Sequence, residues 1–97
     1  MLKDMTHPNQ IKHFLNLKII SFRINNFTAA NLENANFKNA GLLFASFISA
    51  NLTNADLSGA DLRKAFLEGA NLEGANLEGA NLEGTNLKCI NHPICNS

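Results

Sequence analysis

Three residues near the C-terminus could do chemistry together. Cys89, His92 and Cys95 follow the spacing Cys-x2-His-x2-Cys, and thiolate and imidazole are ligands that zinc prefers in proteins. A structural zinc site needs four ligands, whereas the other histidines, His7 and His13, stand at the opposite end of the chain. The two cysteines could instead form a disulfide, which a reducing cytoplasm disfavours. We expect two free thiols in a tail, with the zinc site and the disulfide as alternatives, and no cofactor.

No other residue set has the pattern of a catalytic site. His7 and His13 have no Ser, Cys or paired carboxylate placed to work with them. The glycines of the repeated Leu-Glu-Gly-Ala-Asn segments do not match a phosphate-binding loop and are typical of turns. We therefore predict no catalytic residues and no enzyme activity.

The elements that would position any site come from a five-residue repeat. Every fifth residue from Leu32 to Leu87 is Leu or Phe, and Ala stands two places before each, except at Thr85. The residue between is mostly Asn or Asp. A period of five scatters side chains around an α-helix and breaks the alternation of a flat strand, so the sequence predicts short extended segments joined by turns. Gly or Asn often follows two residues after the Leu or Phe, where a type II turn needs a positive φ.

This Ala-(Asn/Asp)-Leu-x-x pattern resembles the pentapeptide-repeat family over about residues 15–90. The resemblance implies an all-β fold, a right-handed quadrilateral β-helix (solenoid) with four pentapeptides per coil and about four coils. We expect the β-solenoid over residues 15–90, after a short N-terminal cap over residues 1–14 that could be helical. Residues 91–97 would form a C-terminal tail. The abundance of the family in cyanobacteria hints at a bacterial origin.

The resemblance also places the central Leu and Phe residues inside the solenoid, where residues twenty apart would stack. The preceding Ala must be small, because a larger side chain would push the walls apart. The expected structural core is Leu17, Phe22, Phe27, Leu32, Phe37, Leu42, Phe47, Leu52, Leu57, Leu62, Leu67, Leu72, Leu77, Leu82 and Leu87.

Four apolar residues stand where the family has outward polar side chains. Leu43, Phe44 and Ile48 occupy outward positions, and Phe66 fills the outward Asn/Asp position. Ile48 and Phe66 would lie on one side of adjacent coils, with Leu43 and Phe44 around the corner. Clustered apolar groups on a surface mark contact sites, so we predict a protein interface here. Local repacking of these side chains against the repeat is the alternative.

The charges argue against direct nucleic-acid binding, since the formal net charge is zero and phosphate recognition usually needs a basic surplus. Some relatives in the family resemble duplex DNA and inhibit or protect gyrase, which needs acidic stripes along the axis. Glu68, Glu73, Glu78 and Glu83 are five residues apart and would form a ring around one coil instead. We expect ion pairs between coils, from Glu83 to Arg63 and from Glu68 to Lys88.

The sequence thus favours a non-catalytic structural or protein-interaction module that acts through the outer faces or ends of the solenoid. A DNA mimic that acts on a topoisomerase such as gyrase is the alternative. The partner would be an unidentified protein or a second copy, bound end to end or through the apolar residues. No run approaches the roughly 20 apolar residues of a membrane helix, so we expect a cytoplasmic protein without membrane contact.

Overall fold

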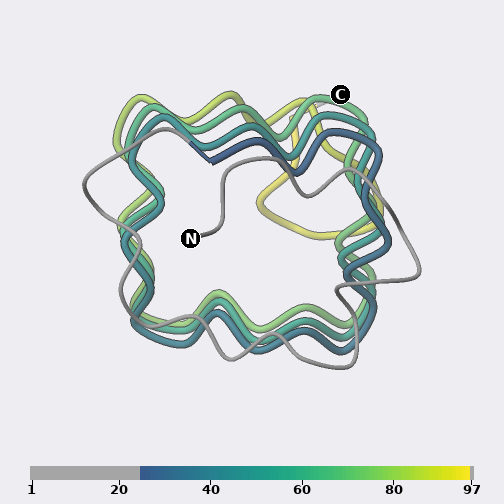
Figure 1. Ribbon diagram of the computed structural model, residues 1–97, viewed down its shortest axis with the longest axis horizontal. Coiled ribbons are helices and arrows are strands. Elements are labelled where there is room, and N and C mark those ends of the chain that lie inside the picture. The colour runs from purple at the N-terminus through teal and green to yellow at the C-terminus, as the bar shows by residue number, and fades with distance from the viewer. Residues whose placement is uncertain (1–24, 97) are drawn as a thin grey trace.

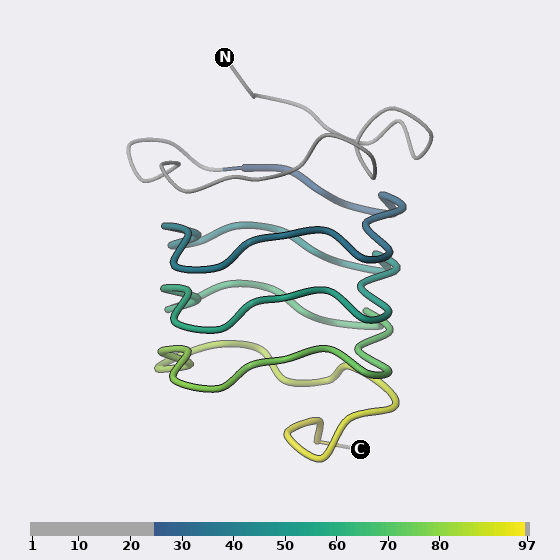
Figure 2. The same ribbon diagram turned by 90° about the horizontal axis from the view of Figure 1, so that it is seen from below.

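In the computed structural model, which describes residues 25–96, the chain winds into stacked four-sided coils (Figure 1). Residues twenty apart form parallel β-bridges, from Asn26–Ser46 to Phe66–Asn86. The extended segments are so short that residues 25–96 contain single bridges but no longer strand and no α-helix. From the side, the coils lie one above another as a short solenoid (Figure 2). The predicted N-terminal cap over residues 1–14 and the predicted core residues Leu17 and Phe22 lie outside the described residues.

Backbone hydrogen bonds connect each coil to the next with a regular pattern. The Leu52 N–H donates to the Asn71 carbonyl at 2.8 Å, and the Asn71 N–H donates to the Ala50 carbonyl at 2.9 Å. Within the coil, the Ala55 N–H donates to the Leu52 carbonyl at 3.0 Å and closes the turn, in which Asn54 has a φ of 59°. This is the hydrogen bond and the positive φ that the sequence predicts for each corner.

The outward Asn and Asp side chains stabilise the turns that follow them. The Oδ1 atom of Asn71, for example, accepts the N–H of Glu73 at 3.0 Å. Such a local bond explains why Asn or Asp recurs just before the central Leu or Phe, since their short side chains can reach the backbone two residues ahead. The same bond is made by Asn26, Asn31, Asn36, Asn51, Asp56, Asp61, Asn76, Asn81 and Asn86.

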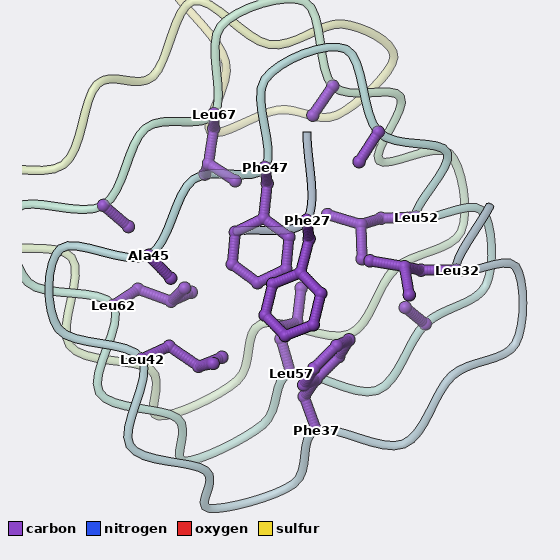
Figure 3. Close-up of a cluster of buried hydrophobic side chains, with 14 of the residues drawn as sticks. Phe27, Leu32, Phe37, Leu42, Ala45, Phe47, Leu52, Leu57, Leu62 and Leu67 are labelled. Atoms are coloured by element: carbon purple, nitrogen blue, oxygen red, sulfur yellow. The ribbon is translucent and has the colours of Figure 1, made fainter. Parts of the chain in front are cut away.

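The inside of the solenoid holds the central residues together with the alanines. Fully buried central residues are Phe27, Leu32, Phe37, Leu42, Phe47, Leu52, Leu57, Leu62, Leu67 and Leu72. Three of the phenylalanines pack on one another (Figure 3): the Phe27 and Phe47 rings stack at 5.0 Å, and the Phe37 ring meets both edge-on. Leu77, Leu82 and Leu87 are only partly buried, because the described residues form no further coil that packs against theirs.

Candidate protein-interaction surface

The register of the coils brings together, at one corner of the solenoid, the four apolar residues that stand at outward repeat positions: Leu43, Phe44, Ile48 and Phe66. Phe66 is bridged to Ser46 on the preceding coil, and Phe44 and Ile48 stand two residues to either side of Ser46. Phe66 therefore lies diagonally between Phe44 and Ile48 on the outer surface, with Leu43 next to Phe44. Phe44 is 40% exposed and Phe66 44% exposed, while Leu43 and Ile48 are half-buried. We call Leu43, Phe44, Ile48 and Phe66 the outer apolar patch.

Phe44 occupies a position that suits glycine or asparagine. Its φ is 64°, in the left-handed region, whereas the same corner position elsewhere holds residues such as Asn54 and Gly59. A side chain with a Cβ in this conformation costs roughly 1–2 kcal/mol. The Nζ atom of Lys64, one coil away, lies 5.6 Å from the centre of the Phe44 ring, in a cation–π contact. Apart from this contact, the turn does not need an aromatic side chain, since Asn or Gly adopts the same backbone conformation at lower cost.

Phe66 also replaces a residue that would stabilise its own turn. Its backbone keeps the coil-to-coil pairing, since its N–H donates to the Ala45 carbonyl at 2.9 Å. Its side chain has no oxygen to accept the N–H of Glu68, unlike the Asn or Asp found at most equivalent positions. The phenylalanine thus forgoes a local hydrogen bond and exposes an aromatic ring to solvent.

One exposed apolar residue was missed by the sequence analysis. Ile90 is 48% exposed and is bridged to Asn71, so it follows a column of outward asparagines, Asn31, Asn51 and Asn71. The chain is one residue short at this point, because a strict twenty-residue spacing from Asn71 would have placed Asn91 there. The missing residue between Leu87 and the next outward position is the signal that could have identified it.

The prediction of two free thiols is wrong, because Cys89 and Cys95 form a disulfide. The chain turns back after Ile90, and the Cys95 N–H donates to the His92 carbonyl at 3.0 Å, which brings the second cysteine to the first. A zinc ion would need both sulfurs as thiolates, so the disulfide removes that alternative. The His92 Nε2 atom lies 3.1 Å from the Ala75 carbonyl oxygen, within hydrogen-bond distance. Across residues 25–96, no group of three or more His, Cys, Asp or Glu side chains is placed to hold a metal ion.

The acidic ring is exposed, as Glu68, Glu73, Glu78 and Glu83 all lie on the surface. The expected ion pair between Glu83 and Arg63 is replaced by one inside a single coil. The Arg63 guanidinium binds both carboxylate oxygens of Asp61, at 2.8 and 2.7 Å. Asp61 lies only two residues away, and its carboxylate already accepts the Arg63 N–H. The Arg63 side chain therefore pairs with this nearby carboxylate and not with Glu83 on the next coil.

The two aspartates of the turns have lowered pKa values. The Arg63 side chain, through its hydrogen bonds, is the main cause of the lowered pKa of Asp61. For Asp56 the main cause is the Ser58 hydroxyl, which donates to Oδ1 at 2.6 Å and lowers the pKa of the carboxyl. Both carboxylates are therefore held in the charged form by the turn that they stabilise.

Comparison with known families gives a direct match. The family described as Pentapeptide repeats matches residues 26–63 and 50–88, in 8 copies. The chain belongs to the pentapeptide-repeat family. The corner turns and the twenty-residue register of this pentapeptide-repeat protein are therefore family features, whereas the outer apolar patch consists of departures from the repeat.

Solved structures of other pentapeptide-repeat proteins are similar to this one. A protein of the Arabidopsis thaliana thylakoid lumen is 41% identical, with 71% of this chain and 57% of that chain covered and a TM-score of 0.46. HetL, involved in heterocyst differentiation regulation in the cyanobacterium Nostoc, is 37% identical, with 74% and 35% covered and a TM-score of 0.44. Rfr23 of the cyanobacterium Cyanothece is 32% identical, with 74% and 59% covered and a TM-score of 0.35. This chain thus spans between about a third and three fifths of these relatives.

The search of curated proteins found no significant match. Within residues 25–96, no helix is long and apolar enough to cross a membrane.

Proposed function

We propose that this pentapeptide-repeat protein is a non-catalytic protein-interaction module that binds its partner through the outer apolar patch. The observation that carries the proposal is that Phe44 and Phe66 are both exposed and both stand where the repeat would be better served by Asn. Exposed apolar residues that also weaken the local backbone structure indicate a binding role, because they do not stabilise the fold.

We also infer the finer geometry of the scaffold from the family. Pentapeptide-repeat proteins form right-handed quadrilateral β-helices, and the four-sided coils with parallel bridges twenty residues apart support that geometry here. A stiff solenoid of this kind holds the patch residues at fixed spacings, which favours recognition over catalysis.

The partner is an unidentified protein or a second copy of this chain, which could also pack end to end. Lys64 lies at the edge of the patch beside Phe44, so an apolar partner surface bordered by acidic residues fits best. The cytoplasmic location stays a prediction, and the disulfide would persist best in an oxidising compartment.

The test replaces both exposed phenylalanines by the residue of the repeat, in the variant Phe44→Asn/Phe66→Asn. Asn at 44 relieves the left-handed strain and Asn at 66 restores the turn hydrogen bond, so we expect stability to stay within about 1 kcal/mol of the parent. Binding of partners captured from the native host, or self-association in sedimentation velocity, should weaken at least about tenfold, as is typical for aromatic hot spots.

The matched control is Asn54→Ser/Asn76→Ser, which changes the same two repeat positions on other sides of the solenoid. Ser already stands at these repeat positions, at Ser49 and Ser46, so the control should fold and bind like the parent. Unchanged binding by Phe44→Asn/Phe66→Asn would show that the patch is not the interface. A loss of folding in that variant would show that the two rings belong to the core.

A further inference from the structure

The last coil of the solenoid ends in an unpaired edge. One coil earlier, the N–H groups of Leu57 and Leu62 donate to the carbonyls of Asn76 and Asn81, at 2.7 and 2.9 Å. Within residues 25–96, the equivalent N–H groups of Leu77 and Leu82 have no backbone acceptor. The side chains follow the same trend, since Leu57 and Leu62 are fully buried but Leu77 and Leu82 only partly so.

Residues 89–96, which we call the C-terminal cap, cover one corner of this edge. Cys89 takes the buried position that Ala30, Ala50 and Ala70 hold in the earlier coils, and it is 5% exposed. Ile90 completes the last pairing: its N–H donates to the Ala70 carbonyl at 2.9 Å, and its carbonyl accepts the Leu72 N–H at 3.0 Å.

The chain then leaves the repeat and folds back under part of the end of the solenoid (Figure 2). Ile94 and Cys95 pack against the buried core. The Asn96 N–H donates to the Leu87 carbonyl at 2.6 Å, and the His92 ring meets the Ala75 carbonyl. The Asn91 Nδ2 atom also donates to the Oδ1 atom of Asn71 at 3.1 Å. The disulfide from Cys95 to Cys89 adds the covalent link between the returning segment and the coil.

We propose that the Cys89–Cys95 disulfide is a redox-sensitive lock that keeps the C-terminal cap over the edge of the last coil. A dithiol reductant would open it in two exchange steps. One thiolate of the reductant attacks the Cys95 sulfur, the more accessible of the two, and the Cys89 thiolate leaves. The second thiol of the reductant then displaces Cys95 and forms the reductant's own disulfide. Two electrons and two protons reach the protein, which ends with two thiols.

Reduction should release residues 90–96 together, because only a few hydrogen bonds, such as those of Ile90, Asn91 and Asn96, then hold this segment on the coil. Leu72, Leu77 and Leu87 would then border an open edge with free backbone donors, which is a surface that can accept an added strand. The lock works at the end of the solenoid and is independent of the outer apolar patch, so it extends the proposed function without resting on it.

Amide hydrogen exchange on the whole chain tests the lock, with and without a small-molecule dithiol such as dithiothreitol. The amides of Asn96, Ile90 and Leu72 should exchange at least about tenfold faster after reduction, as expected for a local opening. The amides of Leu32 and Leu42, which pair with Asn51 and Asp61 farther up the solenoid, should not change.

The variant Cys89→Ala/Cys95→Ala gives a permanently unlocked protein. Ala is the residue that the repeat itself uses at the position of Cys89, so the coil stays packed and only the covalent link is lost. This variant should exchange like the reduced parent and should not respond to the dithiol. Equal protection of Leu72, Ile90 and Asn96 in all states would show that packing alone holds the cap. Faster exchange at Leu32 as well would show that the disulfide stabilises the whole solenoid and not the C-terminal cap alone. Either result overturns the proposal.

Discussion

The outward Asn and Asp side chains give each coil its local definition. Each accepts the N–H two residues ahead, and so it fixes the extended segment and the start of the next turn together. A carboxylate in this position gains a further partner where the residue two ahead is polar. Ser58 adds a hydroxyl bond to Asp56, and Arg63 adds a bidentate pair to Asp61. The turns that contain Asp therefore depend on pH, whereas those that contain Asn do not.

Acid should weaken the turn that Asp61 stabilises. The pKa of Asp61 is lower in the folded protein than its usual value of 3.8, so its contribution is present above that value and is lost as the pH falls through the folded pKa. The free energy of unfolding, measured by denaturant titration, should fall more between pH 5 and pH 3 for the parent than for Asp61→Asn.

Asp61→Asn is a matched change because Asn keeps the oxygen that accepts the Arg63 N–H and removes only the charge. We expect a small effect, since the ion pair is open to solvent, with the Asp61 and Arg63 side chains 34% and 44% exposed. If the two proteins lose stability in parallel, other carboxylates govern the acid response.

Side-chain detail at this scale followed only partly from the sequence. The positive φ of the corners could be predicted, because Gly and Asn at a fixed repeat position suggest it. The fit between Asn39 and Gly59 could not: an added Cβ at Gly59 would collide with the Asn39 side chain of the preceding coil. The ion pair of Arg63 was predicted with the wrong partner, because stacking by twenty residues ignored the nearer carboxylate of Asp61.

At the scale of the coil, a central leucine is buried by the coils that pack on either side of its own. Leu57 has a complete coil on both sides and is fully buried, whereas Leu77 occupies the same column in the last coil and is only partly buried. The two leucines thus occupy the same repeat position with similar flanking residues, and they differ in how far they are buried.

Truncating these two leucines should show how much of their contribution to the free energy of unfolding comes from packing between adjacent coils. Leu57→Ala leaves a cavity in the core and should lower the free energy of unfolding by about 2–5 kcal/mol. Leu77→Ala removes a side chain that is already partly in water, and should cost about half as much or less. Denaturant unfolding of both variants provides the comparison. Equal losses would mean that the last coil is covered in solution, for instance by a second copy.

The repeat pattern predicts which side chains are buried along most of the chain, but not after Leu87. From Leu32 to Leu72 the five-residue period determines which side chains lie inside, because each position is repeated and the repeats agree. After Leu87 the period fails once, and a single missing residue moves Cys89 into the buried column. Whether the chain then turns back to join Cys95 depends on contacts such as that of His92 with Ala75. No local pattern encodes such contacts, so the sequence offered the disulfide only as an alternative to two free thiols.

Over the whole molecule, the charges are spread around the solenoid and do not run along it. Each glutamate of the ring belongs to a different column, and the residue one coil earlier in that column is not acidic. Above Glu73 stands Thr53, with Glu33 one coil farther up. Above Glu78 stand Ser58 and Lys38, and above Glu83 stands Arg63. DNA instead presents about one negative charge per 1.7 Å of its axis. The surface formed by residues 25–96 therefore lacks the continuous rows of negative charge along the axis that a DNA-binding enzyme recognises.

We accordingly expect no effect of this pentapeptide-repeat protein on DNA gyrase. Supercoiling of a relaxed plasmid should proceed at the same rate with and without micromolar protein, because a ring of four carboxylates on a chain of zero net charge cannot replace duplex phosphates. The informative contrast is a variant with Glu68, Glu73, Glu78 and Glu83 all changed to Gln. Inhibition by the parent that weakens with salt and disappears in this variant would establish mimicry and displace the interaction-module proposal. Inhibition that persists in the variant but is lost in Phe44→Asn/Phe66→Asn would instead make the enzyme a partner of the outer apolar patch.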